Sequence, residues 1–152
     1  MATRRCAGPA NLVRWYAHEV GDGQAASRAR GPLGASEVAR ARVTMRAETA
    51  ARVAANELAK GDVLSTARFA GVHAARESAS LVPSIGSGSV PDVALHLEVG
   101  DSCVDVVASA SADAAAHGLV AVTVAALTVY DMCKAVDRTM TVDIDAVGVP
   151  RD

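Results

Sequence analysis

The first regular pattern along the chain is an alternation of apolar and polar residues that begins at Val38. One side of this segment carries Ala39, Ala41, Val43 and Met45, and the other carries Arg40, Arg42 and Thr44. A repeat of two residues is typical of a strand with one buried face. Two segments with apolar residues at three- and four-residue spacings follow, at 47–58 and 62–78, and we expect both to be helices. Asp62 stands at the N-cap position of the second helix.

The second half of the chain alternates again, apart from one long apolar run. Segments 92–99 and 103–110 alternate on either side of a short turn, which predicts a hairpin. The run at about 114–136 is too long for a strand and predicts a buried central helix. A last strand at 140–146 turns Met140, Val142, Ile144 and Ala146 to one face. The order of elements predicts an α+β ferredoxin-like sandwich, a split βαβ with one extra helix, whose helices cover one face of an antiparallel sheet.

Residues 1–35 do not continue these patterns. Prolines and glycines interrupt the segment, which predicts an irregular N-terminal arm. They are Pro9, Gly21, Gly23, Gly31 and Pro32. A chain of 152 residues is long enough for one domain with its own core. We therefore expect a single folded domain at 36–152.

Charge and composition exclude several classes of protein. The net charge is −2 and the pI is about 6.1. The chain as a whole therefore lacks the positive charge that favours binding to nucleic acid or to an anionic membrane. We find neither a targeting segment nor about 18 uninterrupted apolar residues. The cysteines Cys6, Cys103 and Cys133 are odd in number and lack C-x-x-C spacing, which indicates neither a disulfide framework nor a zinc ribbon. We expect a soluble, unexported protein of the reducing cytoplasm.

Two sets of charged residues are candidates for chemistry. Asp131 and Lys134 share a face at the end of the apolar helix, where the pKa of a lysine responds strongly to its surroundings. On spacing alone, a solvated ion pair is the commoner interpretation. Lys60 precedes a glycine and a helix N-cap, a place that favours an anion, although most such lysines are simple loop residues.

The histidines show no spacing typical of a metal site, and we expect neither a metal nor a cofactor. His73 and His96 are most simply surface residues. His117 is kept as a candidate because it lies near the start of the central helix.

Two stretches, KGDVLSTARFAGVHAAR (60–76) and VAALTVYDMCKAVDRTM (124–140), closely resemble the cyclic pyranopterin monophosphate synthase (MoaC) family of molybdenum cofactor biosynthesis. VTMR (43–46) and LVP (81–83) match as well. The resemblance implies a ferredoxin-like fold and a homo-oligomer, a hexamer of dimers with active sites at the dimer interface. It also implies a nucleotide-derived small-molecule substrate, 3′,8-cyclised GTP, which is converted to cyclic pyranopterin monophosphate with release of pyrophosphate.

The family register implies roles for the charged residues. Lys60 and Lys134 would bind phosphate or transfer protons, and Asp131 would orient Lys134 and tune its pKa. His117 would contact the substrate.

Other family positions are substituted. Gly86 stands where the family has the histidine of L-C-H-P-L, and Ala115 and His117 stand where it has two glutamates. These losses imply a divergent synthase with weakened or altered activity. Two alternatives stay open. One is a catalytically inactive paralogue that serves as a binding or regulatory subunit, in mixed oligomers with an intact paralogue, and the other is an enzyme acting on a different nucleotide.

Overall fold

A computed structural model describes residues 36–86 and 92–147 of the chain. Its elements are β1 (Ser36–Thr44), α3 (Ala47–Ala54), α4 (Val63–Leu81), β2 (Ala94–Val99), β3 (Cys103–Ala110), a 3-10 turn (Ala112–Ala114), α5 (Ala115–Cys133) and β4 (Thr141–Ala146). This order agrees with the sequence pattern. The helix predicted at 47–58 ends earlier, at Ala54, and the helix predicted at 62–78 continues to Leu81. The arm predicted for residues 1–35 lies outside the described residues.

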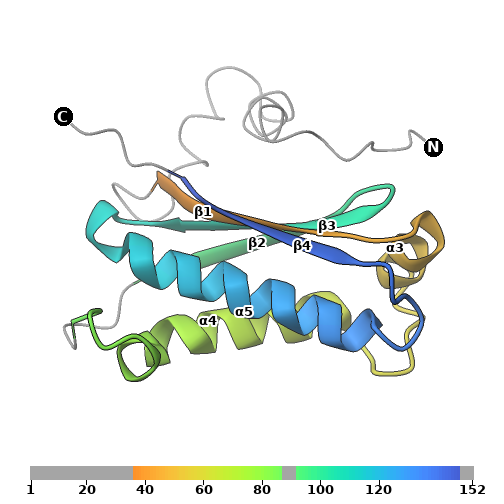
Figure 1. The fold of residues 1–152 in the computed structure, drawn as a ribbon, viewed down its shortest axis with the longest axis horizontal. Coiled ribbons are helices and arrows are strands. Elements are labelled where there is room, and N and C mark those ends of the chain that lie inside the picture. Colours follow the sequence, from red (N-terminus) through yellow and green to blue (C-terminus); the bar gives the residue numbers. More distant parts are fainter. Residues whose placement is uncertain (1–35, 87–91, 148–152) are drawn as a thin grey trace, which may run out of the picture.

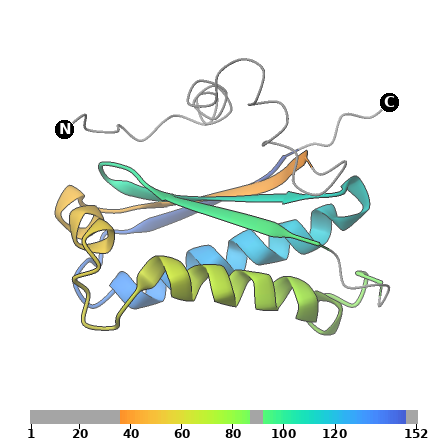
Figure 2. The same cartoon turned by 180° about the vertical axis from the view of Figure 1, so that it is seen from behind.

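The four strands form one antiparallel sheet in the order β2-β3-β1-β4. Helices α4 and α5 lie side by side across one face of this sheet (Figures 1 and 2). Strands β1 and β3 are central, and each is linked through a helix to an edge strand, which is the split βαβ arrangement. Helix α3 is the additional element. The predicted α+β, ferredoxin-like fold is confirmed.

Small residues allow the helices to pack closely on each other and on the sheet. A Cβ added at Gly71 of α4 would lie 2.7 Å from the main-chain oxygen of Ala121 in α5 and would also meet the side chain of Leu95. A Cβ at Gly118 of α5 would meet Val38 of β1. Only glycine has room for these approaches. The structure therefore has a close contact between α4 and α5 at Gly71.

Alternation places the apolar residues of the last strand on one face, and the structure leaves that face of β4 uncovered. Met140 just before β4 is buried, but every residue of β4 is exposed, including Val142 and Ile144. β4 is an edge strand with β1 as its sheet neighbour. Alternation identifies the side to which a residue points. It does not report whether another element covers that side.

Helix α5 is long and apolar enough to cross a membrane by length and composition alone. It packs against α4 and the sheet, as the core helix of a soluble domain does, so this match is weak evidence for a membrane span. Cys133 in its last turn keeps a free thiol, whose pKa is raised by burial. Cys103 is disulfide-bonded. The sequence did not indicate this bond, because three cysteines without C-x-x-C spacing are not typical of a disulfide framework.

Candidate active site

Lys60 and Lys134 both contact the carboxylate of Asp131. Lys60 Nζ lies 3.0 Å from Oδ2, and Lys134 Nζ lies 2.5 Å from Oδ1. These are the only two lysines in the sequence. All three side chains are about half exposed, with fractions of 45% for Lys60, 52% for Asp131 and 53% for Lys134. Because the side chains are exposed, the cluster is accessible to a ligand. Exposed ion pairs stabilise a fold only slightly, so the cluster is not a major source of stability.

The end of α5 positions two members of this lysine–aspartate cluster. Asp131 lies in the last turn, and Lys134 is the C-cap residue, whose N–H donates to Tyr130 O at 2.9 Å. Lys60 Nζ also donates to the main-chain oxygen of Asp131 at 2.8 Å. The last carbonyls of a helix lack partners within the helix, and the C-terminal end attracts cations. Lys60 therefore also satisfies a main-chain carbonyl at the end of α5.

The turn before α4 positions Lys60. Gly61 has a φ of 94°, in the left-handed region that favours glycine, and its N–H donates to Leu58 O. Asp62 is the N-cap predicted from the sequence, and its carboxylate accepts from Ser65 N at 2.9 Å. That hydrogen bond, with one from the Ser65 hydroxyl, lowers the pKa of Asp62. Lys60 is thus held between a tight turn and a capped helix.

Electrostatics keep the cluster charged. Hydrogen bonds from Lys134 and then from Lys60 lower the pKa of Asp131, and the hydrogen bond to Asp131 raises the pKa of Lys134. Two ammonium groups and one carboxylate leave one net positive charge at neutral pH. This charge suits an anionic ligand and disfavours a metal cation. Among the described residues, no group of three or more His, Cys, Asp or Glu side chains could hold a metal ion.

Asp137, which is 1% exposed, was not predicted from the sequence. Its carboxylate accepts hydrogen bonds from Arg46 N at 2.8 Å, Thr49 Oγ1 at 3.0 Å, Thr139 N at 2.9 Å and Thr139 Oγ1 at 2.7 Å. Burial alone would raise its pKa, but these donors outweigh burial and lower it strongly. The Asp-x-Thr spacing, typical of a side chain that bonds the backbone two residues on, was the available signal.

Asp137 ties the loop after α5 to the start of α3. Arg46 is the N-cap residue of α3, and its guanidinium donates to Val136 O and lies 3.4 Å from Asp137 Oδ1. Lys134 precedes this junction, and Lys60 follows α3. One buried carboxylate therefore anchors both segments that carry the lysines.

His117 lies near the opposite end of α5. Fourteen residues separate it from Asp131, or about 21 Å at the rise of an α-helix. Its Nδ1 contacts Ser78 Oγ of α4. Ala115 is at the same end of the helix, so positions 115 and 117 are remote from the lysines within one chain. His73 and His96, expected on the surface, are exposed.

Ser78 was also missed by the sequence analysis. It continues the buried stripe of α4 that includes Val63, Ala67, Gly71 and Ala74. A polar residue within such a stripe requires a hydrogen-bond partner, and this was the available signal.

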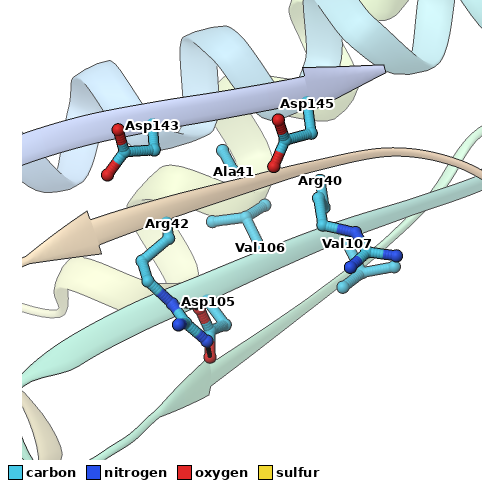
Figure 3. Close-up of a pocket in the computed structure, with 8 residues that line it drawn as sticks. All are labelled: Arg40, Ala41, Arg42, Asp105, Val106, Val107, Asp143 and Asp145. Carbon is cyan, nitrogen blue, oxygen red and sulfur yellow. Dashed lines mark hydrogen bonds and ion pairs between the residues drawn. The ribbon is translucent and has the colours of Figure 1, made fainter. Parts of the chain in front are cut away.

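The face of the sheet away from the helices carries a second group of charges, around a depression of about 310 Å³. Arg42 of β1 and Asp105 of β3 point toward each other there, with hydrogen bonds of 2.6 and 2.9 Å (Figure 3). The hydrogen bond to Asp105 raises the pKa of Arg42. Arg40 is paired with Glu37 at 2.8 Å. Asp143 and Asp145 of β4 line the same depression, which lies on the face of the sheet away from α4 and α5 (Figure 3).

Known proteins are similar to this chain over most of its length. A model described as the MoaC family matches residues 31–149. A cyclic pyranopterin monophosphate synthase from Roseiflexus sp. (strain RS-1) is 44% identical over 111 residues, which are 69% of this chain and 70% of that protein. A protein of the same name from Chloroflexus aurantiacus (strain ATCC 29366 / DSM 635 / J-10-fl) is 39% identical over 148 residues, 90% of this chain and 80% of that protein.

A longer relative is the molybdenum cofactor biosynthesis bifunctional protein of Chlorobaculum tepidum (strain ATCC 49652 / DSM 12025 / NBRC 103806 / TLS). It is 39% identical over 105 residues, 66% of this chain but 34% of that protein. The family match covers most of the described domain and both lysines. The chain belongs to the MoaC family.

Proposed function

We propose that this chain acts in molybdenum cofactor biosynthesis as a cyclic pyranopterin monophosphate synthase. The reaction rearranges 3′,8-cyclised GTP, closes a cyclic monophosphate and releases pyrophosphate. The observation that carries the proposal is the contact of Lys60 and Lys134 with Asp131. Both segments that supply these residues match the family, and their side chains meet although the segments are far apart in sequence.

The charge of the cluster suits a triphosphate. Asp131 raises the pKa of Lys134, so this lysine is a cation at neutral pH and fits the binding of phosphate or the donation of a proton. It is poorly suited to accept a proton while Asp131 stays ionised. Asp131 would orient Lys134, and the phosphates would compete with its carboxylate for both ammonium groups.

A complete site would need a second copy of the chain. His117 and Asp131 are about 21 Å apart along α5, too far to contact one small reacting group together. We propose a homo-oligomer in which one copy supplies the lysine–aspartate cluster and its neighbour supplies the end of α5 that carries His117. Exposed apolar side chains on both long helices support such an assembly, with Phe69 of α4 75% exposed and Leu127 of α5 58% exposed.

The direct test is to supply the purified chain with 3′,8-cyclised GTP and measure both cyclic pyranopterin monophosphate and pyrophosphate. We expect turnover above the rate in buffer, and a loss of at least about a hundredfold in Lys134→Ala or Lys60→Ala. Arg138→Ala is the matched control, because it removes an exposed cation four residues beyond Lys134. A wild-type rate equal to buffer would overturn the proposal.

A second candidate function is that of a binding subunit without activity, and the substituted family positions favour it. Gly86 has open space around it and offers no imidazole, and Ala115 offers no carboxylate. Such a subunit would form mixed oligomers with an intact paralogue. Native mass spectrometry after co-expression with an intact family member tests this, because strictly homomeric species would contradict it.

A further inference from the structure

Ser78 of α4 and His117 of α5 form a buried polar contact between the two long helices. Ser78 is fully buried, with 0% exposure, and its Oγ lies against Nδ1 of His117. The same Oγ donates to the main-chain oxygen of Ala75 at 2.8 Å. The hydroxyl therefore has two partners, one within α4 and one across the contact between α4 and α5.

The proton of the hydroxyl determines the tautomer of the imidazole. A serine hydroxyl has one proton to donate and lone pairs to accept. If the proton is directed to the oxygen of Ala75, the contact with Nδ1 requires that His117 donate. In the neutral ring, Nδ1 then carries the hydrogen and Nε2 carries the free lone pair. No hydrogen bond of Nε2 to another group is present in the described part of the chain.

We infer that His117 is a proton acceptor through Nε2 and that Ser78 is the positioning residue that selects this tautomer. The catalytic part of this inference rests on the proposed function, whereas the tautomer does not. In the reaction, a proton leaves the bound substrate or a water molecule and forms an N–H bond at Nε2. The ring becomes an imidazolium whose Nδ1–H stays on Ser78. Thus His117 can act as a base at a position where the family has a carboxylate.

The surroundings permit this change of charge. His117 lies in the first turn of α5, where the helix dipole disfavours a cation. Asp113, four residues earlier, attracts the ring electrostatically, and hydrogen bonds from the Ser111 side chain and from the backbone lower its pKa so that it stays ionised. Ser78, which contacts the ring, does not titrate. Asp113 can therefore compensate a positive charge on the imidazole.

The tautomer can be measured without substrate. Two-bond proton–nitrogen NMR spectra of full-length, ¹⁵N-histidine-labelled protein distinguish the two neutral forms, and the signals lost in His117→Gln assign the residue. We expect His117 to carry its hydrogen on Nδ1, and exposed His73 to show the Nε2–H form that free histidine favours. Nε2–H on wild-type His117 would overturn the inference, and this result needs no variant that might fold poorly.

Variants separate positioning from structure. Ser78→Ala should return His117 to the Nε2–H form and lower kcat by about tenfold with little change in KM, because orientation is part of the contribution of a general base. Ser80→Ala is the matched control, since its hydroxyl makes the same kind of bond to Glu77 O at 2.7 Å. The positioning role would be contradicted if His117 in Ser78→Ala kept its hydrogen on Nδ1 and kcat stayed at the wild-type value. A wild-type chain without turnover would instead remove the proposed function, while the NMR result still decides the tautomer.

Discussion

Lys60 contacts Asp131 across 71 residues of sequence through both the side chain and the main chain of the acid, at 3.0 Å and 2.8 Å. The same lysine thus pairs with a carboxylate and satisfies a carbonyl at the end of α5. The contact joins the turn before α4 to the last turn of the central helix. A structural role as a helix cap and a functional role as a phosphate site are compatible, because a ligand phosphate would displace the carboxylate and leave the carbonyl contact in place.

The first prediction concerns the charge of Lys134. Asp131→Asn removes the anion that raises the pKa of Lys134, so this pKa should fall toward the ordinary lysine value. The chain contains two lysines, so NMR of lysine-labelled protein should follow each ammonium group without overlap. Asp92→Asn, an exposed acid far along the chain, is the control. An unchanged Lys134 titration in Asp131→Asn would mean that the pair does not form in solution.

The second prediction concerns the buried carboxylate. Asp137→Asn places an amide opposite donors from Arg46, Thr49 and Thr139, and an amide nitrogen cannot accept their hydrogen bonds. We expect the free energy of unfolding to fall by about 2 to 4 kcal/mol. Urea denaturation measures the change. Asp92→Asn should stay within about 0.5 kcal/mol of the wild type, as other exposed substitutions do.

The third prediction concerns the free energy of unfolding at low pH. The pKa of Asp137 in the folded state lies below its ordinary value, so its contribution to stability is fully present above about pH 4. It is lost as the pH falls from there through the folded pKa, because the unfolded chain then binds a proton that the native state excludes. The free energy of unfolding of the wild type should therefore fall below pH 4 more steeply than that of Asp137→Asn. Parallel curves in urea titrations at several pH values would rule out this linkage.

Local patterns predicted the elements well and the contacts between them less completely. Alternation identified β1 and β3, because both strands are central and each has one face under the helices. The same pattern gave β4 one apolar face, and that face stays exposed at the edge of the sheet. Burial there depends on what covers the strand, which no local pattern records.

In the candidate site too, some residues were predicted from the sequence and others were not. The resemblance identified Lys60, Asp131 and Lys134, and the structure brings these three together. It also suggested His117, which lies at the other end of α5. Asp137 was missed because, apart from Thr139, its hydrogen-bond partners Thr49 and Arg46 are 88 and 91 residues away in the sequence. A network between segments so distant is visible only once the chain has folded.

The last prediction concerns the close packing of α4 on α5. It compares the substitution of a glycine in that contact with the substitution of a glycine that has open space around it. Gly71→Ala would place a methyl group against the main-chain oxygen of Ala121 and the side chain of Leu95, and a main-chain atom cannot move aside without shifting α5. We expect a loss of about 1 to 3 kcal/mol in the free energy of unfolding. Gly86→Ala is the matched control, because a Cβ there meets nothing within 4 Å, and its free energy should change little. If Gly71→Ala were as stable as the wild type, the two helices would have to lie farther apart than described. The helix contact also carries Ser78 and His117, so the same variant should disturb the His117 tautomer while Gly86→Ala leaves it unchanged.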